Sequence, residues 1–401
     1  MAYKKKIFVF LFILLVFSFA FLFIKNKSLL VDEEAHYLQI KRVLNWDFGV
    51  YNIITVIPGY HYFFAFLGKI FGIDSIRGIR FFNLIVGLIS IFVFLLISSK
   101  INRDFCLIKK LQYAFFPILL PFFFLIYTDV FSLLLVLLSF YFVLIKRYEI
   151  AGIFGILSFF IRQNNAVWIA FMMAFIYFER HGLNIDSKNI WGALKDCWTF
   201  VLGIVISIIF FILNKGFAFG DRAAHTGGIY FGNIFFALFF FFFLFLPLNL
   251  FNFKKVIGFV KKNNWILLVI LFLFIIYMKF FIVNHPYNFI APDYFLRNMI
   301  LGYFGKNILI KCLLFLPIAY SLLSLCVIEL RRKSFYLLYI FSFLFLLPSW
   351  LIEQRYYLIP LSFFILFKRE ENKFVENWTI AIYFFMSILL FYFIGIGKYF
   401  L

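Results

Sequence analysis

Charged residues are scarce in this chain of 401 residues: only 14% are Asp, Glu, Lys or Arg, while 65% are hydrophobic. A soluble globular protein is typically about 25% charged and about 45–50% apolar. So little charge cannot cover so much apolar surface, which excludes a water-soluble enzyme, a disordered chain and a fibrous repeat. The remaining class is an integral membrane protein that crosses the bilayer many times.

Cysteine is also rare. The four Cys residues are scattered without a CxxC pair, so they predict neither a metal site nor a disulfide framework. The sequence further lacks a P-loop, GxGxxG, HExxH or GxSxG motif in a usable context. A mechanism that depends on a soluble nucleotide therefore has no support, and an activated donor would come from the lipid phase, as polyprenyl-phosphate sugars do. We expect neither a metal nor a cofactor.

Phenylalanine and basic residues are abundant. There are 69 Phe, and the 38 Lys and Arg exceed the 18 Asp and Glu, which gives a net charge of +20. In a polytopic protein such an excess holds cytoplasmic loops in place, and no basic groove with interleaved aromatics indicates nucleic acid. No polar stretch is long enough to fold a second core, so we expect residues 1–401 to form one transmembrane domain.

Apolar runs between polar breaks predict an all-α polytopic bundle of about 11–13 transmembrane helices. The run after the N-terminal MAYKKK has no small-x-small cleavage site, so it is expected to be a retained first span. The candidate spans lie near residues 7–24, 79–98, 113–127, 130–145, 150–161, 166–178, 198–213, 233–251, 265–283, 308–328, 335–350, 356–367 and 378–396.

The positive-inside rule places the N-terminus in the cytoplasm, because most Lys and Arg then fall in inner loops. The outer loops carry nearly all mixed clusters of acids, bases, His and Asn. The first outer loop, at about residues 25–78, is the longest, and its segment HYLQIKRVL has the spacing of a helix that lies in the membrane interface. We therefore expect chemistry on the outer face.

The first outer loop begins with the acids Asp32 and Glu33, shortly before His36. A carboxylate at the membrane surface can act as a general base on an acceptor hydroxyl. The alternative is a solvated helix start, because acids favour the positive end of the helix dipole.

Two short polar breaks follow, YTDV with Asp129 and RQNN with Arg162 and Gln163. An acid or an arginine so close to hydrocarbon needs a partner, and a lipid phosphate matches the guanidinium fork. The alternatives are a tight turn with Asp129 as the N-cap of the next helix, and a simple polar turn around Arg162.

The segment GDRAAH places Asp221 and His225 four residues apart, so a helix would bring both to one face. Two such ligands without a third make a weak case for zinc.

Two further clusters complete the outer face. Asp293 and Arg297 are also four residues apart, and a helix salt bridge is the alternative to a functional role. Glu353 and Arg355 lie between two apolar runs, where they could instead neutralise each other.

Read in order, these clusters resemble the eukaryotic alpha-1,2-glucosyltransferase family that adds the last glucose to the dolichol-linked oligosaccharide. The resemblance extends over about residues 30–360. The motifs that carry it are DEEAH (32–36), WD (46–47), TVIPGY (55–60), RFFNL (80–84), YTD (127–129), RQNNAVW (162–168), GDRAAH (220–225), HPYNFIAPDYF (285–295) and EQRYYLIP (353–360).

This resemblance implies a GT-C membrane glycosyltransferase that inverts the anomeric centre. The implied donor is dolichyl phosphate glucose or a similar polyprenyl-phosphate hexose, and the implied acceptor is a diglucosylated lipid-linked oligosaccharide of the N-glycosylation pathway. The product linkage would be alpha-1,2. The membrane would be that of the endoplasmic reticulum, with a lumenal active site, or a prokaryotic cell membrane, where the glycan could differ. The partners are these lipids and the surrounding membrane lipids.

Within this family interpretation, Asp32 is our candidate general base, with Glu33 supporting it, and Arg162 or Arg355 is expected to bind the donor phosphate. The residues expected to orient the substrate are His36, Asp129, Gln163, Asp221, His225, Asp293 and Glu353. Two other classes stay open. A flippase for lipid-linked sugars should show internal repeats and ionisable groups at the midplane, and a scaffold subunit would not need so many charges on one face.

Overall fold

The computed structural model describes residues 2–223 and 225–401 and is all-helical over them apart from three isolated β-bridges. The chain forms two compact units. Unit 1 comprises Met1–Ala114 and Leu119–His225, and unit 2 comprises Phe115–Ile118 and Thr226–Leu401. The prediction of an all-α polytopic membrane protein is confirmed, and a single domain over 1–401 stays a prediction.

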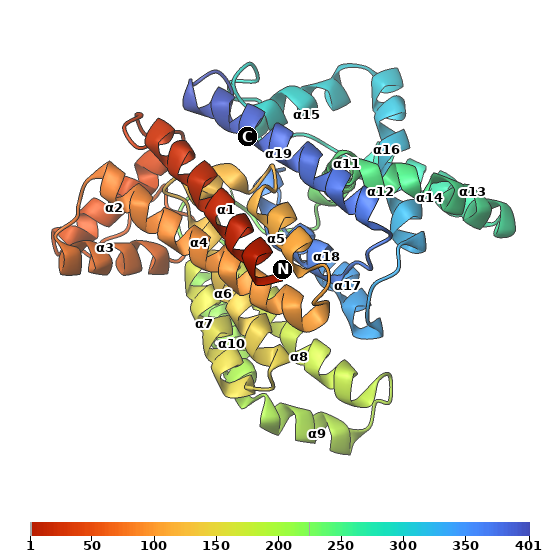
Figure 1. Ribbon diagram of the computed structural model, residues 1–401, viewed down its shortest axis with the longest axis horizontal. Coiled ribbons are helices and arrows are strands. Elements are labelled where there is room, and N and C mark those ends of the chain that lie inside the picture. The colour runs from red at the N-terminus through yellow and green to blue at the C-terminus, as the bar shows by residue number, and fades with distance from the viewer. Residues whose placement is uncertain (1, 224) are drawn as a thin grey trace. The chain divides into compact units, whose positions relative to one another are not determined.

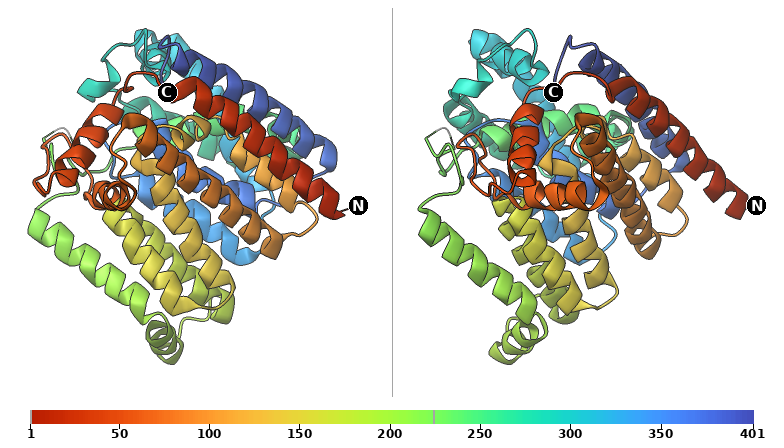
Figure 2. Two further views of the ribbon diagram at one scale, coloured as in Figure 1. Left: turned by 60° about the vertical axis from the view of Figure 1, so that its left-hand side comes forward. Right: turned by 90° about the vertical axis from the view of Figure 1, so that its left-hand side faces the viewer.

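Unit 1 is a bundle in which α7 packs against both α6 and α10, and α4 packs against α6 (Figure 1). The helices α2 and α3 pack on each other within the predicted first outer loop (Figure 2). The elements are α1 (Ala2–Ile24), α2 (Glu33–Leu44), α3 (Gly59–Phe71), α4 (Ile76–Ile101), α5 (Cys106–Ala114), η1 (Leu120–Phe123), α6 (Thr128–Leu144), α7 (Tyr148–Ile161), η2 (Gln163–Asn165), α8 (Ala166–His181), α9 (Ser187–Asp196) and α10 (Trp198–Asn214).

In unit 2, α11 packs against α16 and α17, and α12 packs against α19. The elements are α11 (Gly232–Leu244), α12 (Leu246–Phe251), α13 (Phe253–Lys262), α14 (Ile266–Phe280), η3 (Pro286–Asn288), α15 (Leu296–Lys306), α16 (Ile308–Val327), η4 (Lys333–Tyr336), α17 (Leu337–Leu346), η5 (Gln354–Tyr357), α18 (Leu358–Phe367) and α19 (Lys373–Gly395).

Four helices of the described chain are long and apolar enough to cross a membrane: Ile7–Ile24 within α1, together with α4, α16 and α19. Two bent pairs raise the number to six. In one of them α9 meets the start of α10 at 86°, and the bend is visible in Figure 2. The predicted number of about 11–13 spans is therefore larger than the number of helices that reach this length.

The apolar run predicted as a span at 113–127 is not one continuous helix. The α5 helix ends at Ala114, and only the short 3₁₀-helix η1 follows before α6. Pro117 and Pro121 lie in this run, and each lacks the N–H that an α-helix interior requires. The segment is nevertheless buried, so its apolar residues serve packing and do not form a membrane span.

A buried ion pair fixes the start of the first outer loop. Arg80 in α4 and Glu33 in α2 are both fully buried, and the Arg80 Nη2 to Glu33 Oε2 distance is 2.6 Å. Arg80 also donates to the backbone carbonyls of Ile24, Lys27 and Ser28, at 2.8–2.9 Å. One guanidinium group therefore joins α2 and α4 to the end of α1.

Glu33 uses both oxygens. It accepts hydrogen bonds from the backbone N–H groups of Leu30 and Ile126, at 2.9 and 2.8 Å. Burial of an ion pair is tolerated when hydrogen bonds satisfy its remaining donors and acceptors, as they do at this pair.

We expect Arg80→Leu to lower the free energy of unfolding by about 3–5 kcal/mol, because the substitution leaves the Glu33 carboxylate buried without its counter-charge. Thermal or denaturant unfolding of the purified full chain in detergent micelles measures the change. The matched control is Arg180→Leu, which breaks the partly exposed pair with Asp196 and should cost at most about 1 kcal/mol. Equal losses in the two variants would contradict the role of this pair.

Candidate active site

Asp32 is the residue directly before α2. It is half-buried, and its side chain makes no capping hydrogen bond to the helix. Its backbone N–H donates to the Tyr127 hydroxyl at 3.1 Å, and that hydroxyl donates to the Leu30 carbonyl at 3.1 Å. Tyr127 and the neighbouring Glu33 therefore fix the backbone of Asp32 at the start of α2.

A buried histidine pair lies one helical turn beyond Asp32. His36 Nδ1 and His61 Nε2 are 2.9 Å apart, and His61, in α3, is fully buried. Burial and the neighbouring His36 hold the pKa of His61 well below its ordinary value. The pair thus joins α2 to α3, and the lowered pKa favours the neutral form of His61.

The predicted clusters YTDV and RQNN meet in unit 1. Arg162 Nη1 lies 2.7 Å from Asp129 Oδ1, and Asp129 is buried. The N-cap of α6 is Tyr127, and Asp129 lies in the first turn of the helix. The alternative that assigned the N-cap to Asp129 is therefore wrong. Asp129 instead provides the anionic partner that an arginine at this depth requires.

The Gln163 side chain is hydrogen-bonded to the backbone of two other chain segments. Its Nε2 donates to the carbonyls of Thr55 and Phe217, at 2.9 and 2.7 Å, and its Oε1 accepts from the Ile57 N–H at 3.4 Å. The side chain therefore anchors the first outer loop.

The GDRAAH segment is not helical in its described residues, so the expected i, i+4 face of Asp221 and His225 does not form. Asp221 has a positive φ of 38°, and its N–H donates to the Asn52 side chain at 3.3 Å. Just before it, the Gly220 N–H donates to the Ile54 carbonyl at 3.1 Å. This segment thus lies along the first outer loop.

In unit 2, a single carboxylate is shared by two arginines. Arg355 Nε lies 2.6 Å from Glu353 Oε1, and Arg297 Nη1 pairs with the same oxygen. The pair of Glu353 with Arg355 that the sequence offered as an alternative is therefore present, with Arg297 as a second partner. The three charges sum to +1.

Asp293 does not take part in this cluster. It lies on an exposed loop before α15 begins at Leu296, so the i, i+4 salt bridge with Arg297 that was the alternative to a functional role does not form. The helix starts too late to bring the two side chains to one face.

Buried asparagines hold the Glu353 segment in place. Asn233 Nδ2 donates to the carbonyls of Ser349 and Leu351, and its Oδ1 accepts from the N–H of Glu353 at 3.1 Å. Asn288 makes a matching pair of bonds to the backbone of Ile352. These residues escaped the sequence analysis, although a lone Asn in an apolar run, as in FGNIFF, is a signal that could have found Asn233.

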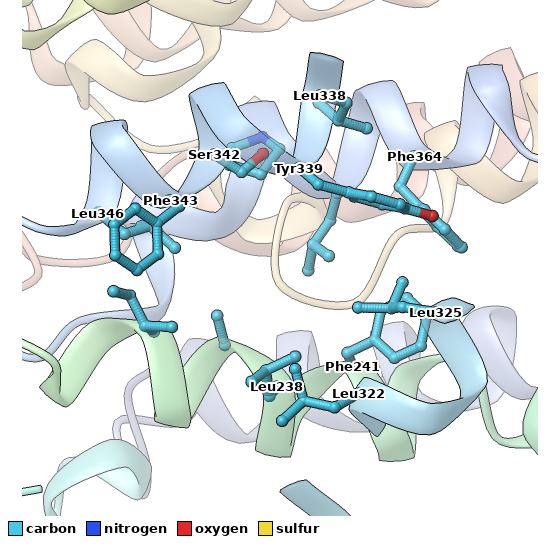
Figure 3. Close-up of a pocket in the computed structure, with 14 residues that line it drawn as sticks. Leu238, Phe241, Leu322, Leu325, Leu338, Tyr339, Ser342, Phe343, Leu346 and Phe364 are labelled. Atoms are coloured by element: carbon cyan, nitrogen blue, oxygen red, sulfur yellow. The ribbon is translucent and has the colours of Figure 1, made fainter. Parts of the chain in front are cut away.

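An apolar cavity of about 220 Å³ lies between α11, α16, α17 and α18 of unit 2 (Figure 3). Leucine and phenylalanine side chains form its walls, and Ser342 and Tyr339 provide its few polar atoms. It carries no charged group among its lining residues, so it suits hydrocarbon and not a phosphate.

Comparison with known proteins identifies relatives along most of the chain. A family model described as "DIE2/ALG10 family" matches residues 26–189 and 175–366, which together exceed half of the chain.

Curated relatives carry the name "Dol-P-Glc:Glc(2)Man(9)GlcNAc(2)-PP-Dol alpha-1,2-glucosyltransferase". The one from Candida albicans is 31% identical over 286 residues, which are 65% of this chain and 62% of the relative. The one from Drosophila melanogaster is 24% identical over 87% of this chain and 86% of the relative. The chain thus spans less than two thirds of the Candida albicans relative. No solved structure gives a significant match.

The histidine pair predicts a pH dependence of stability. Because the pKa of His61 is lower in the folded protein than its ordinary value near about 6.5, the unfolded chain binds more protons below that pH. Stability should therefore be complete above about pH 6.5 and fall as the pH decreases below it. Melting of the full chain in micelles at a series of pH values measures this slope, and His61→Gln should flatten it. An unchanged slope in the variant would refute the assignment.

Proposed function

The chain belongs to the DIE2/ALG10 family, and on that basis we propose that it is an inverting glucosyltransferase of the membrane. It transfers glucose from dolichyl phosphate glucose to a hydroxyl of a lipid-linked oligosaccharide and forms an alpha-1,2 linkage. The names of the relatives support this donor and acceptor. The reaction supplies the precursor for N-glycosylation, and its location is the endoplasmic reticulum membrane with the active site in the lumen.

The observation that carries the proposal is the placement of Asp32. The half-buried carboxylate stands at the start of α2, next to the buried Glu33–Arg80 pair. Asp32 accepts the proton of the acceptor hydroxyl, and the hydroxyl oxygen attacks the anomeric carbon of the donor glucose. The bond from that carbon to the phosphate oxygen breaks, and the polyprenyl phosphate leaves with the electron pair. Glu33 supports this step because it holds the loop that carries Asp32.

Either Arg162 or Arg355 neutralises the leaving phosphate, and charge favours Arg355. Arg162 forms a balanced pair with Asp129. Arg355 belongs to the three-residue cluster in which two arginines share one carboxylate. A preorganised positive charge at the leaving oxygen is the usual source of stabilisation in phosphate departure.

The remaining predicted residues orient the substrate through the loops that they hold. Gln163 fixes the first outer loop against the segment before GDRAAH, and His36 joins α2 to α3. Asp129 and Glu353 position the two arginines. Asp221, His225 and Asp293 lie on or beside connecting segments, where they would meet the acceptor glycan.

We expect Asp32→Asn to lower glucosyl transfer by about 10²–10⁴-fold without loss of folding, because this is the usual contribution of a general base. Transfer by the purified full chain from dolichyl phosphate glucose measures the loss. The matched control is Glu34→Gln, a neighbouring exposed acid in the first turn of α2, which should retain activity. Near-normal transfer by Asp32→Asn would discard the assignment and make Glu33 the next candidate.

We expect Arg355→Lys to raise the donor KM or lower kcat by about tenfold or more, since lysine keeps the charge but cannot present a bidentate fork to phosphate. Steady-state kinetics with varied donor concentration measures the effect. A larger loss in Arg162→Lys than in Arg355→Lys would move the phosphate-binding role to Arg162.

The direct test of the activity uses the purified chain with dolichyl phosphate glucose, dolichyl phosphate mannose and other polyprenyl sugars, each with defined lipid-linked acceptors. The linkage of the product is determined by NMR. An alpha-1,2-glucosyl product is the expected result. Transfer of another sugar, or a product with another linkage, would overturn the stated specificity, and movement of the lipid without any transfer would favour a flippase.

A further inference from the structure

A second cavity in unit 2 combines apolar walls with two polar side chains, Arg297 and Gln354. It lies between α11, α15 and α19 and has a volume of about 350 Å³. Pockets that bind small molecules measure roughly 300–1,000 Å³ and are apolar with a few placed polar groups. Phe239, Phe240 and Leu390 are among its apolar lining residues. The cavity therefore has the composition of a ligand site.

Gln354 is the first unexplained group of this cavity. Its side chain is 1% exposed, and neither Oε1 nor Nε2 has a hydrogen-bond partner in the described part of the chain. Nearly all buried polar groups in native proteins are paired, so an orphaned amide that lines a cavity indicates a missing polar ligand. A ligand with both an acceptor and a hydroxyl would satisfy both atoms.

Arg297 is the second group. Its Nη1 pairs with Glu353 and its Nε donates to Asn298, while Nη2 has no acceptor among the residues that the structure describes. Arg355 shares the same Glu353 oxygen, so one carboxylate serves two guanidinium groups. A phosphodiester oxygen is a strong acceptor that matches the remaining Nη2 donor of Arg297.

The walls suit a hydrocarbon chain. One side is the apolar helix α11, and another is α19, which is long and apolar enough to cross a membrane. Phe243 also lines the cavity and is 44% exposed, so the cavity reaches the surface of the unit at this side chain. A lipid tail could thus leave the cavity along apolar surface.

We propose that this cavity binds the head of the polyprenyl-phosphate sugar donor, an inference that rests on the proposed function. The phosphodiester oxygens accept hydrogen bonds from Arg297 Nη2 and Gln354 Nε2. A sugar hydroxyl donates to Gln354 Oε1, and the first isoprene units lie on Phe239, Phe240 and Leu390. Arg297 and Gln354 are thereby binding residues that act beside Arg355.

The test is direct binding of farnesyl phosphoryl glucose to the full chain in micelles, without acceptor. Gln354→Leu and Arg297→Lys should each weaken binding by about tenfold or more, the usual cost of losing a hydrogen bond to a charged group. Ile300→Trp, which fills the cavity, should weaken it as well, whereas Ile308→Trp, at an exposed position, should not. Unchanged affinity in the first three variants would overturn the proposal.

Competing ligands identify the occupant. Farnesol should bind weakly and equally to the wild type and Gln354→Leu, because it has the tail without the phosphate. Inorganic phosphate should compete only weakly, because it lacks the tail. Competition by phosphatidylglycerol as strong as that by unlabelled farnesyl phosphoryl glucose would make this an ordinary phospholipid site and overturn the assignment.

A stability measurement separates binding from a structural role. Gln354→Leu should leave the melting temperature of the lipid-free chain unchanged or higher, because no partner is orphaned. The control is Gln39→Leu, since the Gln39 amide bonds both the Gly49 carbonyl and the Tyr51 N–H, and its loss should lower the melting temperature. An equal decrease in both variants would show that Gln354 is a structural residue and would contradict the proposal.

The two hypotheses fail in different ways. If the wild type transfers glucose but the donor KM is unchanged in Gln354→Leu and Arg297→Lys, the cavity assignment is wrong and the proposed function stands. If farnesyl phosphoryl glucose binds as expected but no sugar is transferred to any acceptor, the proposed function fails while the lipid site stands.

Discussion

The buried pair of Glu33 and Arg80 is the interaction on which the proposed chemistry depends. It joins the end of α1, the start of α2 and the segment before Tyr127, and so determines where the backbone of Asp32 lies. A full charge pair is stable at zero exposure only because backbone groups satisfy its remaining donors and acceptors. We therefore propose separate roles for the adjacent acids: the half-buried Asp32 acts as the general base, and the buried Glu33 fixes the loop that carries it.

Unit 2 also contains buried residues that fix the backbone beside a residue with a proposed chemical role. Asn233 and Asn288 fix the backbone around Glu353, and Glu353 fixes two arginines. Two arginines thus share one carboxylate, and Arg355 is the proposed partner of the donor phosphate. In each unit, buried polar groups fix the backbone beside the residue for which we propose a chemical role. Such fully bonded networks hold a site in one geometry before the substrate arrives.

The sequence predicted the helical membrane class, a helix over HYLQIKRVL (36–44) and the family, because composition, periodicity and ordered motifs are local signals. The apolar run at 113–127 is buried without being a continuous helix, which its composition could not reveal. The spacing of Asp221 and His225 would place them on one helix face, but no helix forms there. Arg80 was seen only as part of a motif, and the partner of Glu33 could not be predicted, because the two lie 47 positions apart. The Glu353–Arg297 contact and the unpaired amide of Gln354 likewise arise only from tertiary packing.

The most direct test of the division between Asp32 and Glu33 is the pH dependence of kcat/KM for the acceptor in the wild type, Asp32→Asn and Glu33→Gln. A general base produces a decrease in rate towards acid pH. The account predicts that this acid limb persists in Glu33→Gln at reduced amplitude and disappears in Asp32→Asn. An acid limb that persists in Asp32→Asn and vanishes in Glu33→Gln would contradict it, because Glu33 would then be the proton acceptor.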